Sequence, residues 1–230
     1  MIVRILFLLI FCLSSCNKKS ISKKEHSIYW QKNSAEYVAL SYQAFNIAKL
    51  RLDKNVKSSD RKPAIVIDID ETILNNLPYN QMLIDSSKSF NEQSWSRWVN
   101  KKIAKAIPGS LEFLNYARTK NIELIYLSNR RIENYEPTKE NLISLGFPFN
   151  EKTLMLLRDE TTDKTKRRNS LSKYEIIMLI GDNLSDFDSV FYNKSNEKRI
   201  NNVDSLSYLF GEKFILLPNL IYGDWDKGFE

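Results

Sequence analysis

The stretch AIVIDIDETIL (residues 64–74) decides the fold of this chain. Its first four residues are apolar, which is typical of a parallel strand that a sheet buries on both faces. Two aspartates, Asp68 and Asp70, follow almost directly. Carboxylates are rarely buried unless they are paired or bind a metal, so we expect this strand to end at a site where its acids have partners.

Helices and strands are expected to alternate on both sides of this stretch. Helical spacing of apolar residues marks residues 34–52 and 111–119, and a further helix is expected to end at Gly146. Apolar runs predict four more strands, at 122–128, 153–157, 176–180 and 214–217. This alternation predicts an α/β fold with a mostly parallel sheet, in which ligands bind beyond the carboxyl ends of the strands.

Reactive side chains follow the predicted strands in four places, beginning with Asp68 and Asp70. The others are Ser128, Asn129 and Arg130 after the second strand, Lys164, Lys166, Arg167 and Arg168 after the third, and Asp182 and Asp186 after the fourth. Together they supply a carboxylate nucleophile, an acid/base, a hydroxyl donor, a cation and metal ligands. Such a set suits phosphoryl transfer, in which positioning and charge neutralisation dominate.

The order of these motifs resembles that of the haloacid dehalogenase superfamily, and most closely the class C acid phosphatases. The matching stretches are DIDET (68–72), LSNR (127–130), the basic loop, GDNLSDF (181–187), and the flanks WQKNSAEYVALSYQAFNIAK (30–49), SWSRWV (94–99) and LPNLIYGDW (217–225). The resemblance implies a Rossmann-like, mostly parallel sheet flanked by helices, with a small, mainly helical cap.

The resemblance also implies a division of the chain. A phosphatase domain is expected at 34–230, opening with a helix and connection at 34–62. The core would comprise 63–74 and 107–230, and the cap would be the insert 75–106.

The roles of the acids follow from this resemblance and from their chemistry. Asp68 is expected to attack phosphorus and form an aspartyl-phosphate, and Asp70 to act as general acid and then general base. The resemblance implies Mg²⁺ held by the carboxylates of Asp68 and Asp182 and by the backbone carbonyl of Asp70. Asp186 would not bind the metal directly but would orient these ligands or the waters on the metal.

Residues of the second and third motifs are expected to bind the phosphoryl group and the substrate. The Ser128 hydroxyl is expected to donate to a phosphoryl oxygen, and Asn129 and Arg130 to bind substrate beside it. Spacing to the fourth motif favours Lys164 as the active-site lysine, with Lys166 as the alternative.

Two aromatic residues are expected at the leaving group. By resemblance, Phe90 and Tyr222 align with residues that line the family's substrate pocket, where two rings could sandwich a nucleobase or an aryl group. Ordinary core packing is the alternative for both rings. Glu71, the third acid of the opening stretch, is assigned no role.

The N-terminus predicts export. An apolar run at 5–13 follows a basic residue and leads through small residues to Cys16, which is the layout of a secretory signal. The stretch LSSC resembles a bacterial lipobox, so we expect a signal peptide at 1–15 and a lipid-anchored, flexible tether at 16–33. The protein would then be an extracytoplasmic, membrane-anchored lipoprotein. The alternative is an ordinary signal peptide with an incidental cysteine.

Composition is that of one globular domain, and its mildly basic charge fits an anionic small substrate, an anionic lipid or nucleic acid without deciding among them. The chain has 230 residues and a formal net charge of +6, and its basic residues are scattered. The densest basic run, KTKRR (164–168), contains no aromatic residue, so binding of nucleic acid is disfavoured.

These observations predict a Mg²⁺-dependent phosphomonoesterase of the acid phosphatase or 5′-nucleotidase type, with nucleoside monophosphates as expected substrates. A phosphotransferase that uses the same intermediate is one alternative. A surface-anchored binding lipoprotein with a vestigial site is another. The expected assemblies include a homodimer.

Overall fold

A five-stranded parallel sheet forms the centre of the protein, as seen in a computed structural model that describes residues 22–55 and 60–228. The central strand is β1 (Lys62–Ile67), which pairs with β4 (Glu123–Arg131) and β6 (Tyr174–Gly181). The outer strands are β5 (Leu154–Arg158), beside β4, and β7 (Phe214–Leu216), beside β6. The predicted α/β fold with a mostly parallel sheet is confirmed.

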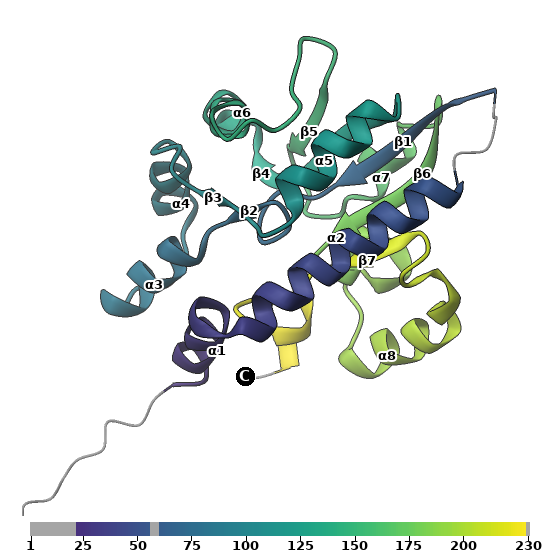
Figure 1. Ribbon diagram of the computed structural model, residues 1–230. Coiled ribbons are helices and arrows are strands. Elements are labelled where there is room, and N and C mark those ends of the chain that lie inside the picture. The colour runs from purple at the N-terminus through teal and green to yellow at the C-terminus, as the bar shows by residue number, and fades with distance from the viewer. Residues whose placement is uncertain (1–21, 56–59, 229–230) are drawn as a thin grey trace, which may run out of the picture.

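Helices cover both faces of this sheet. Figure 1 shows α2 (Ala35–Asn55) and α5 (Ser110–Thr119) lying across one face. The other helices of the core are α6 (Tyr135–Ser144), α7 (Thr165–Asn169) and α8 (Asn196–Ser205). Short 3-10 helices at Ile132–Asn134, Leu184–Asp186, Ser189–Phe191, Ser207–Leu209 and Asp224–Gly228 join these elements.

The residues of β1 alternate between two apolar clusters, which explains why its sequence is apolar at successive positions. Ile65 and Ile67 belong to the larger cluster, which includes residues of α2 and α5. Ala64 and Val66 belong to a second cluster on the opposite face. All four side chains are buried, as expected for the middle strand of a doubly covered parallel sheet.

The expected cap insert contains two helices, α3 (Leu77–Asp85) and α4 (Glu92–Val99). Its two ends are joined by β2 (Leu74–Asn75) and β3 (Lys105–Ala106), which pair antiparallel. The indole of Trp98 also donates a hydrogen bond to the side chain of Asn76, at 2.9 Å. These contacts therefore hold the entrance and the exit of the insert together.

The expectation of a flexible tether is wrong for its last part. Residues Lys23–Asn33 form helix α1, which begins with a capping box between Ser22 and Glu25. Ile28 of this helix is buried and packs with Leu77 of α3 and Ile221. The helix was missed because its sequence is mostly polar, and few of its side chains reach the core.

The predicted signal peptide and Cys16 lie outside the described residues. Among the residues that are described, no helix is both long and apolar enough to span a bilayer.

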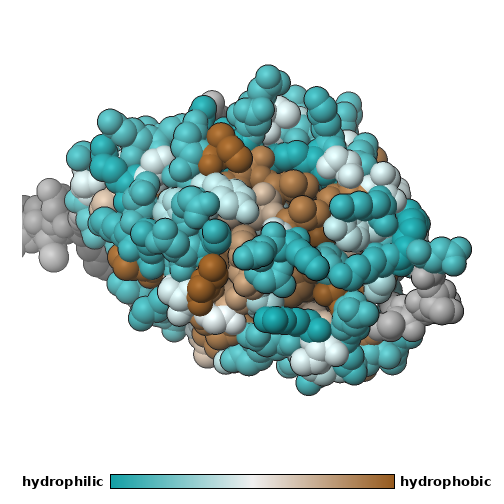
Figure 2. All heavy atoms as spheres, turned by 90° about the horizontal axis from the view of Figure 1, so that it is seen from above, coloured by the Kyte–Doolittle hydropathy of each residue, from teal (hydrophilic) through white to brown (hydrophobic). Residues whose placement is uncertain are grey.

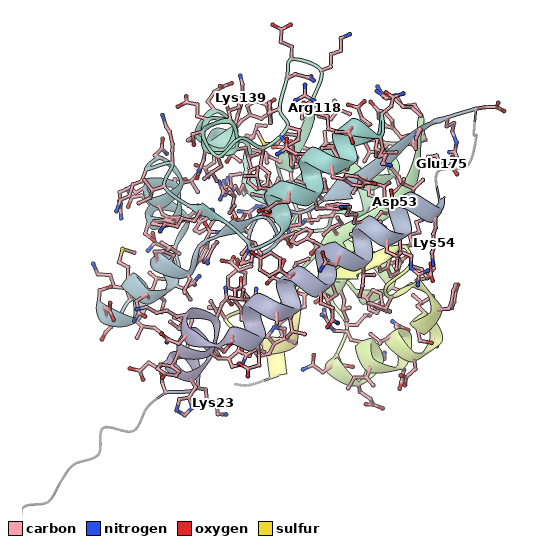
Figure 3. All side chains as sticks on the ribbon, viewed as in Figure 1. Lys23, Asp53, Lys54, Arg118, Lys139 and Glu175 are labelled. Carbon is pink, nitrogen blue, oxygen red and sulfur yellow. The ribbon has the colours of Figure 1, made fainter. Side chains whose placement is uncertain are left out.

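Positive charge is spread around the surface. The face seen in Figure 2 is largely hydrophilic, with apolar side chains gathered near its centre. The basic residues labelled in Figure 3, Lys23, Lys54, Arg118 and Lys139, come from four different helices. This distribution agrees with the scattered lysines and arginines of the sequence.

Candidate active site

The end of β1 delivers Asp68 to the carboxyl edge of the sheet. Its backbone N–H donates to the carbonyl of Ile180 in β6, at 2.9 Å, so the chain stays in register one residue beyond the strand. The Asp68 side chain is buried, and its Oδ2 lies 3.3 Å from the hydroxyl of Thr72. The strand thus holds a carboxylate rigidly below the surface.

Lys164 compensates the charge of Asp68. It lies directly before α7, its side chain is 4% exposed, and its Nζ donates to Asp68 Oδ1 and, at 2.7 Å, to Asp186 Oδ1. The charges of these two aspartates raise the pKa of Lys164 against the opposing effect of burial, so it stays protonated. Lys166, the alternative, is exposed. The structure therefore brings Lys164 to the carboxylates.

Three aspartates gather at this point. Oxygens of Asp68, Asp182 and Asp186 all lie within 4.8 Å of one another. Asp182 is held by the side-chain amide of Asn219, which donates to its Oδ2 at 2.7 Å. Asp186 accepts the backbone N–H of Asn183 at 3.0 Å. The fourth motif thus places both of its aspartates beside the first.

The electrostatics of this cluster favour a bound cation. Burial, together with the charges of Asp186 and Asp70, raises the pKa of Asp68 to about 7 against the lowering effect of Lys164. Burial also raises the pKa of Asp182 well above its ordinary value. Three carboxylates and one lysine leave excess negative charge, and an all-oxygen donor set suits Mg²⁺. The residues present therefore fit the expected metal.

Asp70 has its own cationic partner, Arg130. The guanidinium donates from Nη2 to Asp70 Oδ1 at 2.8 Å and from Nε to both carboxylate oxygens at 3.0 and 3.2 Å. Its remaining nitrogen donates to Thr138 at 2.9 Å, and the side chain is 1% exposed. Arg130 borders the cavity described below, but its hydrogen bonds position Asp70, a contact that the sequence did not predict.

The other two residues of the second motif differ in position. Ser128 is fully buried, and its hydroxyl donates to Asp70 Oδ2 at 3.4 Å while accepting the N–H of Arg130. Asn129 lines the cavity. Arg167 braces both, donating at 2.6 Å to the carbonyl of Ser128 and to Asn129 Oδ1. The predicted contact of Ser128 with phosphate stays a prediction, because its present partners are protein groups.

A cavity of about 400 Å³ opens above these residues, a size suited to a small-molecule ligand. Its base contains the catalytic candidates Asp68, Asp70, Lys164, Asp182 and Asp186. The insert contributes Tyr79, Leu83, Phe90 and Trp95 to its wall, while Tyr192 and Tyr222 come from the core. Phe90 and Tyr222, 132 positions apart by their residue numbers, thus border one cavity, and their contact with substrate stays a prediction.

Phe90 and Tyr222 are placed differently within this wall. Phe90 is 55% exposed, and its ring meets Tyr79 edge-on with centroids 6.4 Å apart. Tyr222 is half-buried, and its hydroxyl donates to Oε2 of Glu71. The Phe90 ring is therefore available to a ligand, whereas the Tyr222 hydroxyl is held by its hydrogen bond to Glu71.

Sequence reasoning missed several residues of the site. They are Glu71, which is fully buried, Asn219, which holds Asp182, and three further residues that line the cavity, Lys24, Tyr192 and Asp224. The capping box at Ser22 and Glu25 could have indicated the helix that carries Lys24. For the others the sequence gives no local signal, because their roles arise from contacts between distant segments.

Comparisons with known proteins agree with this geometry. The family model "HAD superfamily, subfamily IIIB (Acid phosphatase)" matches residues 12–225. The crystal structure of the class C acid phosphatase from Bacillus anthracis with tungstate bound is similar at a TM-score of 0.85 and 39% identity, covering 89% of this chain and 86% of that one.

Plant proteins are more distant relatives. The stem 28 kDa glycoprotein of Glycine max is 28% identical over 185 residues, which are 77% of this chain and 70% of that protein. Acid phosphatase 1 of Solanum lycopersicum is 28% identical over 134 residues, which are 55% of this chain and 52% of that protein. With the family model spanning nearly the whole chain, the protein belongs to subfamily IIIB of the HAD superfamily, the acid phosphatases, which are phosphomonoester hydrolases.

Proposed function

We propose that this protein is a Mg²⁺-dependent phosphomonoesterase that hydrolyses small phosphomonoesters, including nucleoside 5′-monophosphates, through an aspartyl-phosphate. The observation that carries the proposal is the cluster of Asp68, Lys164, Asp182 and Asp186 at the base of a cavity with aromatic walls. The tungstate bound to the Bacillus anthracis relative supports it, because tungstate is a tetrahedral oxyanion like phosphate.

In the first step, an Asp68 carboxylate oxygen attacks phosphorus, and the bond between phosphorus and the leaving oxygen breaks. Asp70 gives its proton to that oxygen, which departs as an alcohol. Lys164 holds the attacking carboxylate and neutralises charge on the phosphoryl group. Mg²⁺, held by Asp68, Asp182 and the backbone carbonyl of Asp70, would supply further neutralisation of that charge.

In the second step, water attacks phosphorus of the aspartyl-phosphate and Asp70 takes a proton from the water. The bond between phosphorus and the Asp68 oxygen breaks, which frees inorganic phosphate and restores the Asp68 carboxylate. The contacts of Asp70 support this dual role. Its Oδ1 accepts from Asn76 and Arg130 at 2.8 Å each, whereas the contacts of Oδ2 are 3.2 and 3.4 Å long. Oδ2 is thus the oxygen that we expect to carry the proton.

The leaving group is expected to lie between the aromatic walls. Phe90 and Tyr222 border the same cavity as the aspartates, and stacking of a base on an aromatic ring contributes about 1–3 kcal/mol. A nucleoside is therefore a suitable leaving group, whereas a small alkyl alcohol would leave this part of the cavity unfilled.

The test is release of inorganic phosphate from adenosine 5′-monophosphate and from glycerol 2-phosphate. We expect release that stops in excess EDTA and returns with Mg²⁺, and that Asp68→Asn abolishes. Full activity in EDTA would exclude the metal, and an unchanged rate in Asp68→Asn would exclude the nucleophile. A variant of the exposed Asp204, Asp204→Asn, is the control for removing an aspartate.

The proposal extends to location. The lipobox-like LSSC and the apolar run before it support lipidation of Cys16 and an extracytoplasmic, membrane-anchored protein. We expect the full chain to fractionate with membranes and Cys16→Ser to release it. Membrane association that is unchanged in Cys16→Ser would refute this anchor.

A further inference from the structure

Glu71 is an unusual residue for its position. Its side chain is fully buried, and its backbone is left-handed, with φ of 54°. The carboxylate accepts the hydroxyl of Tyr222 and, at 2.9 Å, the backbone N–H of Asn76. No lysine or arginine in the described ranges forms an ion pair with it, so its hydrogen-bond partners are neutral groups.

These features disfavour a glutamate unless it has a specific task. A left-handed backbone is energetically unfavourable at a residue other than glycine. Burial of a carboxyl without a cation adds to that cost, and the negative charges of Asp70 and Asp182 act against Glu71 as well. A glycine would satisfy the turn at lower cost, so the side chain itself is what the site uses.

Glu71 joins two parts of the cavity that are distant in sequence. Asn76 precedes α3, the first helix of the insert, and its side chain donates to Asp70 and accepts from Trp98. Tyr222 lies 151 residues after Glu71, in an irregular segment near the C-terminus. One carboxylate therefore links the start of the insert to the opposite aromatic wall.

The segment that carries Tyr222 is bound to the catalytic motifs at two further points. Asn219 donates to Asp182, and Asp224 accepts the hydroxyl of Ser185 and pairs with Arg199 at 3.1 Å. These three contacts, made by Asn219 and Asp224, flank Tyr222 but do not involve its ring. Of the contacts described for this segment, the one with Glu71 holds the Tyr222 hydroxyl, and so restrains how the ring stands in the cavity.

We propose that Glu71 is a positioning residue that fixes the Tyr222 ring as a wall for flat, aromatic leaving groups, and so determines selectivity without touching substrate. The inference rests on the proposed phosphomonoesterase activity. It assigns Glu71 a role separate from those of its neighbours, since Asp68 and Asp70 serve the phosphoryl group and Glu71 serves the group that departs.

The experiment compares selectivity, defined as kcat/KM for adenosine 5′-monophosphate divided by kcat/KM for glycerol 2-phosphate. The variants are Tyr222→Phe, which keeps the ring and removes its hydroxyl, Glu71→Gln, and the double variant. The control is Tyr208→Phe, the same change at a tyrosine that is 69% exposed. Circular dichroism checks that each variant is folded.

Loss of one hydrogen bond to a buried carboxylate predicts that selectivity falls about 3- to 10-fold in each single variant, mainly through KM for the nucleotide. The double variant should fall no further, because Glu71→Gln weakens and Tyr222→Phe removes the same hydrogen bond. Wild-type selectivity in Tyr222→Phe overturns the proposal, and so does an additive loss in the double variant. If Glu71→Gln does not fold, Tyr222→Phe alone decides.

A failure of the proposed function gives a different result, because the wild type would then release phosphate from neither substrate. In that case, isothermal titration calorimetry measures the affinity of the wild type, Tyr222→Phe and Glu71→Gln for adenosine 5′-monophosphate. A similar loss of affinity in Tyr222→Phe and Glu71→Gln supports the positioning role, and unchanged affinity overturns it.

Discussion

Replacement of Lys164 by methionine tests the electrostatic reasoning most directly. The lysine side chain is 4% exposed, and its two partners, Asp68 and Asp186, are 8% and 9% exposed. Methionine keeps a similar volume and removes the charge. Two buried carboxylates then lose the cation that both of them contact, and Asp182 remains nearby.

The size of the effect follows from the burial of this cluster. Removing one partner of a buried ion pair costs about 3–5 kcal/mol, because the charge left behind is uncompensated. The carboxylates can avoid part of that cost by taking up protons, which becomes harder as pH rises. In EDTA we therefore expect Lys164→Met to lose about 3–5 kcal/mol of unfolding free energy at pH 8 and less at pH 5.

The assay is urea unfolding followed by tryptophan fluorescence, in EDTA, at both pH values. Lys166→Met is the matched control, since Lys166 is exposed two positions away. Phosphate release with Mg²⁺ should fall by a factor of about 100 or more in Lys164→Met only. Equal effects of the two variants, or a loss in Lys164→Met that does not grow with pH, would refute the reasoning.

Three further predictions follow from the site. Asn219→Ala should raise the Mg²⁺ concentration needed for half-maximal phosphate release about 10- to 100-fold, because Asn219 orients Asp182. An unchanged Mg²⁺ titration would contradict this prediction. Phe90→Ala should lower kcat/KM for adenosine 5′-monophosphate about 5- to 150-fold, because the base loses its stacking contact. The change for glycerol 2-phosphate should be smaller. Equal losses for both substrates would count against a contact between the Phe90 ring and the base. In EDTA, the unfolding free energy of the wild type should fall as pH rises from about 4 to 7. Burial raises the pKa of Asp68 to about 7, so this carboxyl keeps its proton to higher pH in the folded protein than in the unfolded chain. The free energy of unfolding should therefore fall by up to about 1.4 kcal/mol per pH unit. Added Mg²⁺ should abolish this dependence on pH.

Much of the fold could be predicted from the sequence, because its signals are local. Apolar runs marked each strand of the parallel sheet, and helical spacing marked α2 and α5. The reactive residues of the four motifs lie at or beyond the carboxyl ends of strands of one parallel sheet, with Ser128, Asn129 and Arg130 inside the last part of β4. Their gathering at that edge therefore followed from topology. The approach of Asp182 and Lys164 to Asp68 is an example.

What escaped prediction depends on contacts between distant residues. Arg130 and Asp70 are 60 positions apart, so the ion pair between them has no local signal in the sequence. Glu71 was assigned no role because nothing near it in sequence reveals Tyr222. Helix α1 escaped for a different reason, since a polar helix that buries few side chains has the composition of a tether.

The short ladder between β2 and β3 has a consequence for how this enzyme could change its substrate. Leu74 pairs with Ala106 and Asn75 with Lys105, so the chain leaves the core and returns to it at nearly the same place. An exchange or lengthening of the segment between them adds little loop-closure entropy and does not displace the strand that carries Asp68. The helices of the insert that line the cavity thus form a replaceable module. We expect a graft at residues 77–104, which keeps Asn76 and its hydrogen bond to Asp70, to alter specificity while the chemistry stays intact.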